Sequence, residues 1–146
     1  MAVPPLGVKF ATATEAIAAV NSGQFVVVMD DEGRENEGGL IMAAEDITPA
    51  QMVLIVRYTT GIIGAPMTKA RAEELKLPRM VERNEDVNGT SFTVSCDHVD
   101  TTTGVSAVDR VTTGLANYSE KADKFNRPGR IFPLIARERA REARAH

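Results

Sequence analysis

The chain has 146 residues, 43% of them hydrophobic, which leaves room for one ordinary domain with a single core. A formal net charge of −3 and a pI of about 5.4 argue against a primary nucleic-acid binder, because neutralising phosphates needs a surplus of Lys and Arg. With only Cys96 and two histidines, the chain can form neither an intramolecular disulfide nor a structural zinc site with four Cys and His ligands. Because we find neither a secretory signal nor an apolar run that could span a bilayer, we expect a cytoplasmic protein that binds neither membrane nor nucleic acid.

Helices and strands alternate along the predicted chain. Capping boxes, in which a Thr and the Glu or Gln three residues later satisfy each other's backbone N–H groups, begin at Thr12 and Thr48. The continuous apolar run 25–29 predicts a central strand that is covered on both faces. The predicted elements are helix 14–22, strands 25–29 and 40–44, helix 48–58, strand 61–67, helix 69–75, strand 91–98, helix 106–118 and the apolar segment 131–134. This alternation predicts an α/β fold, a single-domain layered sheet with helices packed on it.

The C-terminal part of the chain changes character. Pro133 lies in the apolar segment 131–134 and favours a sheet edge or a strand end, because proline has no N–H to donate. From Ile135 onward the composition shifts to Ala, Arg and Glu, which is typical of a solvated helix. We therefore expect an α/β domain over 1–134 and a charged helical tail over 135–146.

The most unusual segment is the acidic loop, residues 30–39, which contains five carboxylates directly after an apolar strand. Crowded carboxylates raise one another's pKa, and a hard divalent cation such as Mg²⁺ relieves their repulsion. Glu35 and Glu37 alternate in a way that would let both face one cation. The alternative is a solvated acidic hairpin turn, in which three glycines give the backbone its freedom.

The Thr-rich turn, residues 101–106, lies just before a predicted helix. Its hydroxyls and backbone amides could hold an anion such as phosphate at the positive end of the helix dipole. Ordinary N-capping explains the same residues equally well.

Two reactive side chains lie in the predicted strand 91–98. Cys96 continues the apolar face of Phe92 and Val94, so we interpret it as a buried core thiol without chemistry. His98 lies at the strand end among acidic neighbours, which could hold it protonated or orient it as a base. An exposed histidine without a role is the simpler interpretation.

Four blocks of sequence, in this order, resemble the 3,4-dihydroxy-2-butanone 4-phosphate synthase family. The blocks are Val28–Gly38; Gly89–Val94; Thr102–Ala107 with Asp109, Arg110, Thr112 and Thr113; and Asn126–Gly129 with Phe132–Leu134. The resemblance covers nearly everything from Thr12 to Leu134. It implies an α/β fold, a homodimer, Mg²⁺ (Mn²⁺ being the alternative ion) and a lyase reaction of riboflavin biosynthesis. In that reaction the sugar phosphate ribulose 5-phosphate gives 3,4-dihydroxy-2-butanone 4-phosphate and formate.

The resemblance also implies roles for individual residues. It implies catalytic roles for Asp30, Asp31, Arg34 and Glu35, substrate contacts for Arg34, Glu35, Thr103 and Ser106, and metal binding for Glu35 and Glu37. A bound Mg²⁺ would polarise substrate oxygens, and the neighbouring carboxylates would move protons. The acidic loop has the groups that this chemistry requires.

Several positions depart from the family pattern. Gly39 stands in place of a substrate-binding Asp, Gly64 in place of Cys, Tyr58 in place of His, and Arg130 in place of a catalytic His. An Arg cannot exchange protons as an imidazole does, although it could bind phosphate. The family's later Gly-His-Thr-Glu-Ala segment, with a metal-binding His, is also expected to be absent. The alternative hypothesis is therefore a catalytically silent or repurposed homologue that binds a phosphorylated sugar or a partner subunit.

Overall fold

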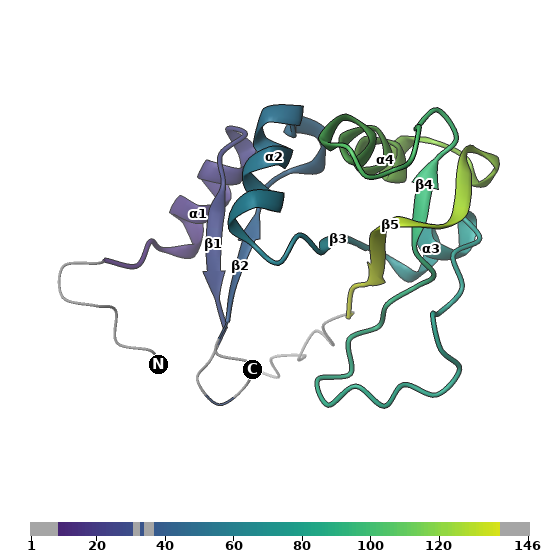
Figure 1. Cartoon of the computed structure of the whole chain (residues 1–146). Helices are drawn as coiled ribbons and strands as arrows, with labels where there is room; N and C mark the ends of the chain where they lie inside the picture. The colour runs from purple at the N-terminus through teal and green to yellow at the C-terminus, as the bar shows by residue number, and fades with distance from the viewer. Residues whose placement is uncertain (1–8, 31–32, 34–36, 138–146) are drawn as a thin grey trace.

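The computed structural model describes residues 9–30, 33 and 37–137 and has the predicted alternation of helices and strands (Figure 1). The elements, in chain order, are α1 (Ala13–Asn21), β1 (Val26–Met29), β2 (Gly38–Ile41), the 3-10 helix η1 (Ala44–Asp46), α2 (Pro49–Tyr58), β3 (Ile63–Met67), α3 (Lys69–Glu74), β4 (Cys96–His98), α4 (Ala107–Ser119), the 3-10 helix η2 (Ala122–Lys124) and β5 (Phe125–Ile135). The predicted α/β class is confirmed. Within the described ranges no helix is long and apolar enough to cross a bilayer.

Both predicted capping boxes are confirmed. At the start of α1 the Thr12 N–H donates to Glu15 Oε2 at 2.7 Å, and the Glu15 N–H donates to Thr12 Oγ1 at 3.3 Å. At the start of α2 the corresponding distances between Thr48 and Gln51 are 2.9 and 3.3 Å. Each helix therefore begins where the local sequence satisfies its first free N–H groups.

The described strands form two sheets. The first is the antiparallel hairpin of β1 and β2, in which Val27 lies opposite Leu40. The second has the order β3-β5-β4, with β5 parallel to β3 and antiparallel to β4. The core beside this second sheet is formed by Met67, Ala72, Leu75, Leu77, Cys96, Ala116 and Phe125.

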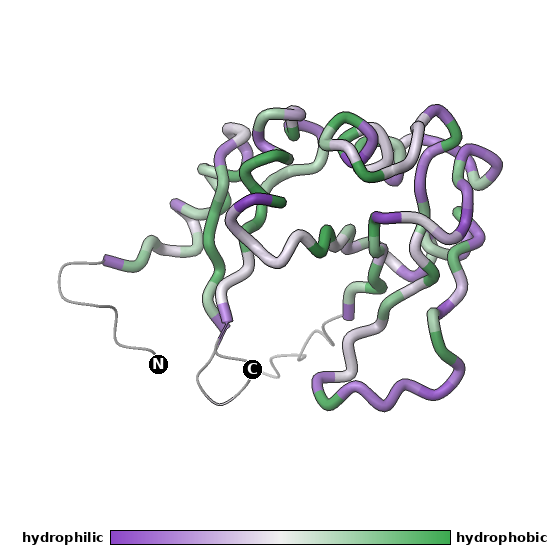
Figure 2. The backbone as a smooth tube through the Cα atoms, in the orientation of Figure 1, coloured by the Kyte–Doolittle hydropathy of each residue, from purple (hydrophilic) through white to green (hydrophobic). Residues whose placement is uncertain are grey.

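The prediction that run 25–29 is a central strand covered on both faces is wrong. The only strand that pairs with β1 in the described part of the chain is β2. Val27, Val28 and Met29 are 62%, 49% and 45% exposed. Figure 2 shows that the hydrophobic colouring is pronounced along β1 and α2, away from the core of the second sheet. The apolar run gave the strand correctly but did not show what covers it.

Of the two places predicted for Pro133, a sheet edge or a strand end, the edge is wrong, because β5 is the central strand of its sheet; Pro133 lies close to the end of β5, which is Ile135. Pro133 lacks an N–H, but its carbonyl accepts hydrogen bonds from the Thr93 N–H at 2.9 Å and from Thr93 Oγ1 at 3.1 Å. β5 continues to Ile135, and the Ala136 N–H donates to the Met67 carbonyl at 2.9 Å. Ordered backbone therefore passes the expected domain boundary at 134, whereas residues 138–146 of the expected tail lie outside the described residues.

An apolar cavity of about 200 Å³ separates the hairpin from the second sheet. Side chains from β2, α2, β3 and α4 line it, among them Leu40, Ile41, Met52, Ile55, Ile63 and Tyr118. Among the described residues no strand pairing joins the hairpin to the second sheet, and Gln51 Nε2 of α2 donates to the Gly23 carbonyl, just before β1, at 3.4 Å.

Candidate active site

The acidic loop connects the two strands of the hairpin. Asp30 follows β1 and Glu37 precedes β2, and the Asp30 N–H donates to the Glu37 carbonyl at 3.0 Å. This bond continues the β-ladder beyond its last pair, Met29 with Gly38, and brings the two ends of the loop together. Asp30 is partly buried, whereas Glu37 is exposed.

The carboxylates of this loop suit a hard cation, which takes oxygen ligands. The exposed Glu37 carboxylate is available as such a ligand. The remaining predicted loop residues, Asp31, Arg34 and Glu35, lie outside the described residues. Over the residues that are described, no group of three or more His, Cys, Asp or Glu side chains is placed to hold a metal.

The Thr-rich turn is built around the buried carboxylate of Asp109 in the first turn of α4. This carboxylate accepts hydrogen bonds from the Thr102 N–H at 3.0 Å, Thr102 Oγ1 at 2.9 Å and the Gly104 N–H at 3.1 Å. These bonds, the one from the Thr102 backbone above all, hold the pKa of Asp109 below its usual value despite the opposing effect of burial. Two backbone amides that the sequence offered to a phosphate are therefore already bound within the protein.

Ser106 and Thr103 differ in their surroundings. Ser106 is the N-cap of α4, and its Oγ accepts the Asp109 N–H at 3.0 Å, as the capping interpretation predicted. Thr103 is exposed at the tip of the turn. Substrate contacts by both residues remain predictions.

The strand ends that flank the acidic loop lie away from the Thr-rich turn within the single chain. Figure 1 shows α4, with the turn before it, along the upper edge of the molecule, whereas β1 ends and β2 begins at the lower edge. Of the predicted residues that the structure describes, Asp30 and Glu37 therefore lie apart from Thr103 and Ser106.

His98 is buried, so the expectation of an exposed strand-end histidine is wrong. Only 6% of His98 is exposed, because β4 lies beneath α4 and the His98 N–H donates to Thr113 Oγ1 at 3.0 Å. Its Nδ1 accepts the Asp100 N–H at 3.2 Å, and its ring meets the Phe125 ring edge-on at 5.9 Å. Nε2 is buried with no hydrogen-bond partner among the residues described.

Cys96 is a core thiol, as predicted. It is fully buried, and this burial raises its pKa to about 12. Its Sγ lies 3.7 Å from Asn117 Oδ1. A thiol in such surroundings stays protonated and is a poor nucleophile.

Asp97 is a charged residue whose importance the sequence reasoning missed. It is 6% exposed and accepts hydrogen bonds from both the backbone and the side chain of Arg130. The sequence did contain a sign of this role: Asp97 is an acidic residue that directly follows the core residue Cys96 in a predicted strand. Sequence reasoning treated it only as a neighbour of His98.

The structure also locates other positions that depart from the family pattern. Gly39 lies in β2 with open space around it, since an added Cβ would meet nothing closer than the Val28 carbonyl oxygen at 3.9 Å. At Gly64 in β3 an added Cβ would lie 3.3 Å from Leu134 Cδ2. Tyr58 ends α2 and is 71% exposed. A larger side chain would fit at Gly39 without rearrangement.

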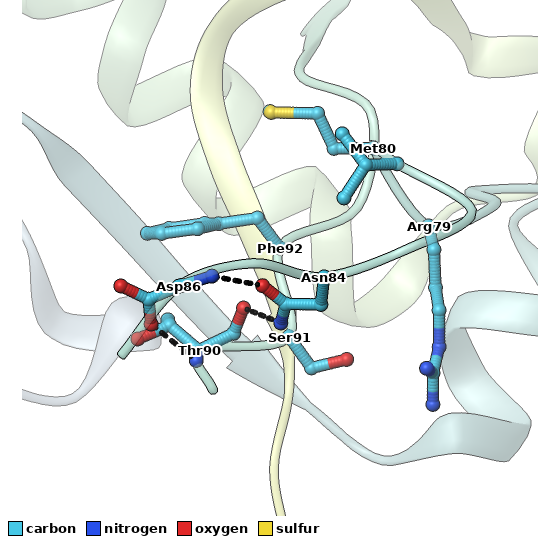
Figure 3. A pocket seen from close by; sticks show the side chains of 8 residues that line it. Arg79, Met80, Asn84, Asp86, Thr90, Ser91 and Phe92 are labelled. Atoms are coloured by element: carbon cyan, nitrogen blue, oxygen red, sulfur yellow. Dashed lines mark hydrogen bonds between the residues drawn. The ribbon is translucent and has the colours of Figure 1, made fainter. Parts of the chain in front are cut away.

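A small cavity of about 160 Å³ lies beside the loop before Phe92 (Figure 3). Its polar groups bond one another: the Asp86 N–H donates to Asn84 Oδ1 at 2.9 Å, and the Thr90 N–H donates to Asp86 Oδ2 at 2.7 Å. The Arg79 side chain points away from this network in Figure 3. These hydrogen bonds hold the chain loop over residues 84–90 in shape, and we assign them no chemical role.

Comparison with known proteins agrees with the sequence blocks. The sequence profile of 3,4-dihydroxy-2-butanone 4-phosphate synthase matches residues 14–146. The 3,4-dihydroxy-2-butanone 4-phosphate synthase of Candida albicans is 48% identical over 130 residues, which are 87% of this chain and 64% of that protein. The riboflavin biosynthesis protein RibBA of Bacillus mycoides is 49% identical over 126 residues, 85% of this chain and 32% of that protein.

The fold is similar as well. A crystal structure of a 3,4-dihydroxy-2-butanone 4-phosphate synthase in complex with two magnesium ions superposes with a TM-score of 0.85 at 45% identity, covering 88% of this chain and 61% of that one. The chain therefore spans less than two thirds of the length of these relatives. By sequence and by fold, it belongs to the 3,4-dihydroxy-2-butanone 4-phosphate synthase family.

Proposed function

We propose that the chain is a lyase of riboflavin biosynthesis that converts ribulose 5-phosphate into 3,4-dihydroxy-2-butanone 4-phosphate and formate. The observation that carries this proposal is the acidic loop, which has the family's pattern from Val28 to Gly38 in a chain 48% identical to a synthase of that name. The two products together contain all the atoms of the substrate, so the reaction needs no oxidant, reductant or second substrate.

Glu35 and Glu37 would hold a Mg²⁺ ion, with Mn²⁺ as an alternative. When bound, the ion would polarise the carbonyl and hydroxyl oxygens of the sugar and stabilise the negative charge of an enediolate. Support comes from the exposed Glu37 carboxylate at the base of the loop and from the magnesium-bound relative of the same fold.

The remaining loop residues would act on the sugar directly. Asp30 and Asp31 would accept and return protons as the sugar enolises and rearranges. Arg34 and Glu35 would orient the sugar oxygens, because a guanidinium and a carboxylate together offer donors and acceptors. Thr103 and Ser106, at the N-terminal end of α4, would contact the phosphate, where the helix dipole favours a negative charge.

We further propose that the protein works in the cytoplasm as a homodimer. The exposed apolar side chains of β1 support a second copy, since contiguous exposed apolar surface commonly marks an interface. The distance of Asp30 and Glu37 from Thr103 and Ser106 within one chain also supports a second copy, because a partner could bring the two pairs of residues together.

The second candidate function is binding without turnover. Gly39 and Arg130 favour it, because the first lacks a side chain that could contact substrate and an arginine cannot exchange protons as a histidine does. This homologue would bind ribulose 5-phosphate or a partner subunit and release no formate.

One experiment separates the two candidates. Purified chain is incubated with ribulose 5-phosphate and Mg²⁺, and formate is followed by ¹H NMR, with EDTA and the near-isosteric Glu35→Gln variant as controls. The lyase proposal predicts formate in the complete reaction and its loss in both controls. Binding of ribulose 5-phosphate, measured by calorimetry, with no formate would instead support the silent homologue.

A further inference from the structure

Arg130 belongs to a bulge that interrupts the pairing of β4 with β5. Cys96 pairs with Ile131, whereas the next residue, Asp97, pairs with Asn126, so residues 127–130 of β5 have no opposite partners in β4. Bulges of this kind bend a strand and redirect its side chains, and they are common beside active sites.

Several contacts fix the shape of this bulge. The Gly129 N–H donates to Ser95 Oγ at 3.1 Å, and the Gly129 backbone lies so close to β4 that an added Cβ would be 1.9 Å from the Cys96 carbonyl carbon. The Arg127 guanidinium donates to the backbone carbonyls of Leu75, Ala122 and Phe125. Because the bulge is held from both sides, the backbone fixes the point from which the next side chain, that of Arg130, starts.

The carboxylate of Asp97 determines where that side chain goes. Its Oδ1 accepts the Arg130 backbone N–H at 2.7 Å, and its Oδ2 accepts a hydrogen bond from Arg130 Nη1 at 3.0 Å. The Asp97 side chain is 8% exposed, whereas the Arg130 side chain is 48% exposed. A buried carboxylate therefore holds one corner of a guanidinium on a side chain that is about half exposed.

The same carboxylate touches the Thr-rich turn. A Cβ added at Gly104, whose φ is +74°, would lie 2.0 Å from Asp97 Oδ2, so the turn packs directly against the carboxylate. Asp97 thus stands between the Thr-rich turn and the side chain at position 130. Along the chain, Asp97 comes a few residues before the Thr-rich turn, and α4 and η2 lie between that turn and position 130.

We propose that Asp97 is a positioning residue, which holds the side chain at position 130 beside the Thr-rich turn and directs it toward the bound sugar phosphate. This inference deepens the proposed function and rests on it for the identity of the substrate. The negative charge of Asp97 offsets the positive charge of the guanidinium. Its effect is therefore to fix the direction of the side chain at position 130 and not to make the site more positive.

Other ionisable side chains near position 130 have contacts of their own. Asp109 of α4 accepts hydrogen bonds from the Thr102 and Gly104 N–H groups of the turn. His98 of β4 packs against Phe125, and Arg127 of the bulge is bonded to backbone carbonyls. Asp97 is therefore the carboxylate that a titratable side chain at position 130 would meet first.

A histidine at position 130 provides a reporter that does not depend on activity. The imidazole pKa is measured by NMR titration in Arg130→His and in Arg130→His/Asp97→Asn, where the second change keeps the shape of residue 97 and removes its charge. A carboxylate within hydrogen-bonding reach favours the protonated imidazole, so we expect the pKa to be about 1 pH unit higher in the single variant. Equal pKa values in the two proteins would overturn the proposal.

A second measurement uses the unaltered arginine, in case the double variant fails to fold. In the unaltered chain we expect the two Nη groups of Arg130 to give separate ¹⁵N signals, because the bond to Asp97 restrains rotation of the guanidinium. In Asp97→Asn the two signals should merge. Merged signals in the unaltered chain would contradict a fixed side chain.

Kinetics connect the inference to the proposed function. Asp97→Asn should lower kcat for formate release roughly 10- to 100-fold, since small misplacement of a group near reacting atoms is costly, while the thermal unfolding temperature changes little. An unchanged kcat would show that Asp97 has only a structural role. If the unaltered chain releases no formate, the proposed function fails, and the NMR titration still decides whether Asp97 positions the side chain.

Discussion

At the scale of single residues, Asp109 supports the Thr-rich turn through a pH-dependent contribution to stability. Its pKa is lower in the folded chain than the value of about 3.9 expected after unfolding. Its contribution is therefore fully present above the unfolded pKa and is lost as the pH falls through the folded pKa.

The corresponding prediction concerns Asp109→Asn, which should be less stable than the unaltered chain at pH 7 and should lose less stability between pH 7 and pH 3. Urea unfolding at the two pH values measures both quantities. Asp123→Asn, a change of an exposed carboxylate in η2, is the matched control and should follow the unaltered chain. An identical acid-induced loss in Asp109→Asn and the unaltered chain would refute this account of the turn.

Cys96 gives a second prediction at this scale. With a pKa of about 12, the folded thiol should react with iodoacetamide at pH 8.5 on the order of a thousandfold more slowly than the same thiol in guanidinium chloride. Mass spectrometry of samples quenched over time gives both rates. Rapid alkylation of the folded chain would mean that Cys96 is accessible and ionised, against its burial in the core.

At the scale of elements, the bulge of β5 depends on a glycine with no space for a side chain. Gly129→Ala should lower the free energy of unfolding by about 1–3 kcal/mol or more, because the added Cβ would overlap the backbone of β4. Gly114→Ala in α4 is the contrasting change: nothing lies within 4 Å of its added Cβ, and alanine should stabilise the helix by about 0.5–1 kcal/mol. Chemical denaturation of the two variants checks both signs, and a harmless Gly129→Ala would contradict the packing described here.

The elements also show what local sequence can and cannot predict. The starts of α1 and α2 were predictable, because a capping box is completed within four residues. The surroundings of β1 and the central place of Pro133 were not, because both depend on which distant strands pair. Burial of His98 follows in the same way from the packing of α4 on β4.

The candidate site likewise has parts that local sequence predicts and a part that it does not. The acidic loop and the Thr-rich turn were found from contiguous residues, and the family resemblance built on such blocks is confirmed. The pair of Asp97 and Arg130 was not found, since it joins residues on two strands through a shift in register. The register shift between β4 and β5 depends on how the two strands pair, and it cannot be predicted from the order of residues along either strand.

At the scale of the whole molecule, the exposed apolar face of β1 predicts self-association. Sedimentation velocity should show a dimer at micromolar concentration, and Val27→Lys, which places a charge on a side chain that is 62% exposed, should shift the chain toward the monomer. Val87→Lys, in a loop position that is 99% exposed, is the matched control and should leave the dimer intact. A chain that sediments as a monomer at every concentration would contradict the proposed dimer.

The central claim is that this chain, which spans less than two thirds of the length of its relatives, still performs their cleavage of a carbon–carbon bond. The most direct test mixes the purified chain with ribulose 5-phosphate and Mg²⁺ and follows ¹H and ³¹P NMR signals together. We expect formate and a four-carbon phosphate in equal amounts, both dependent on Mg²⁺. No formate, in a buffer where the Candida albicans synthase releases it, would contradict the claim.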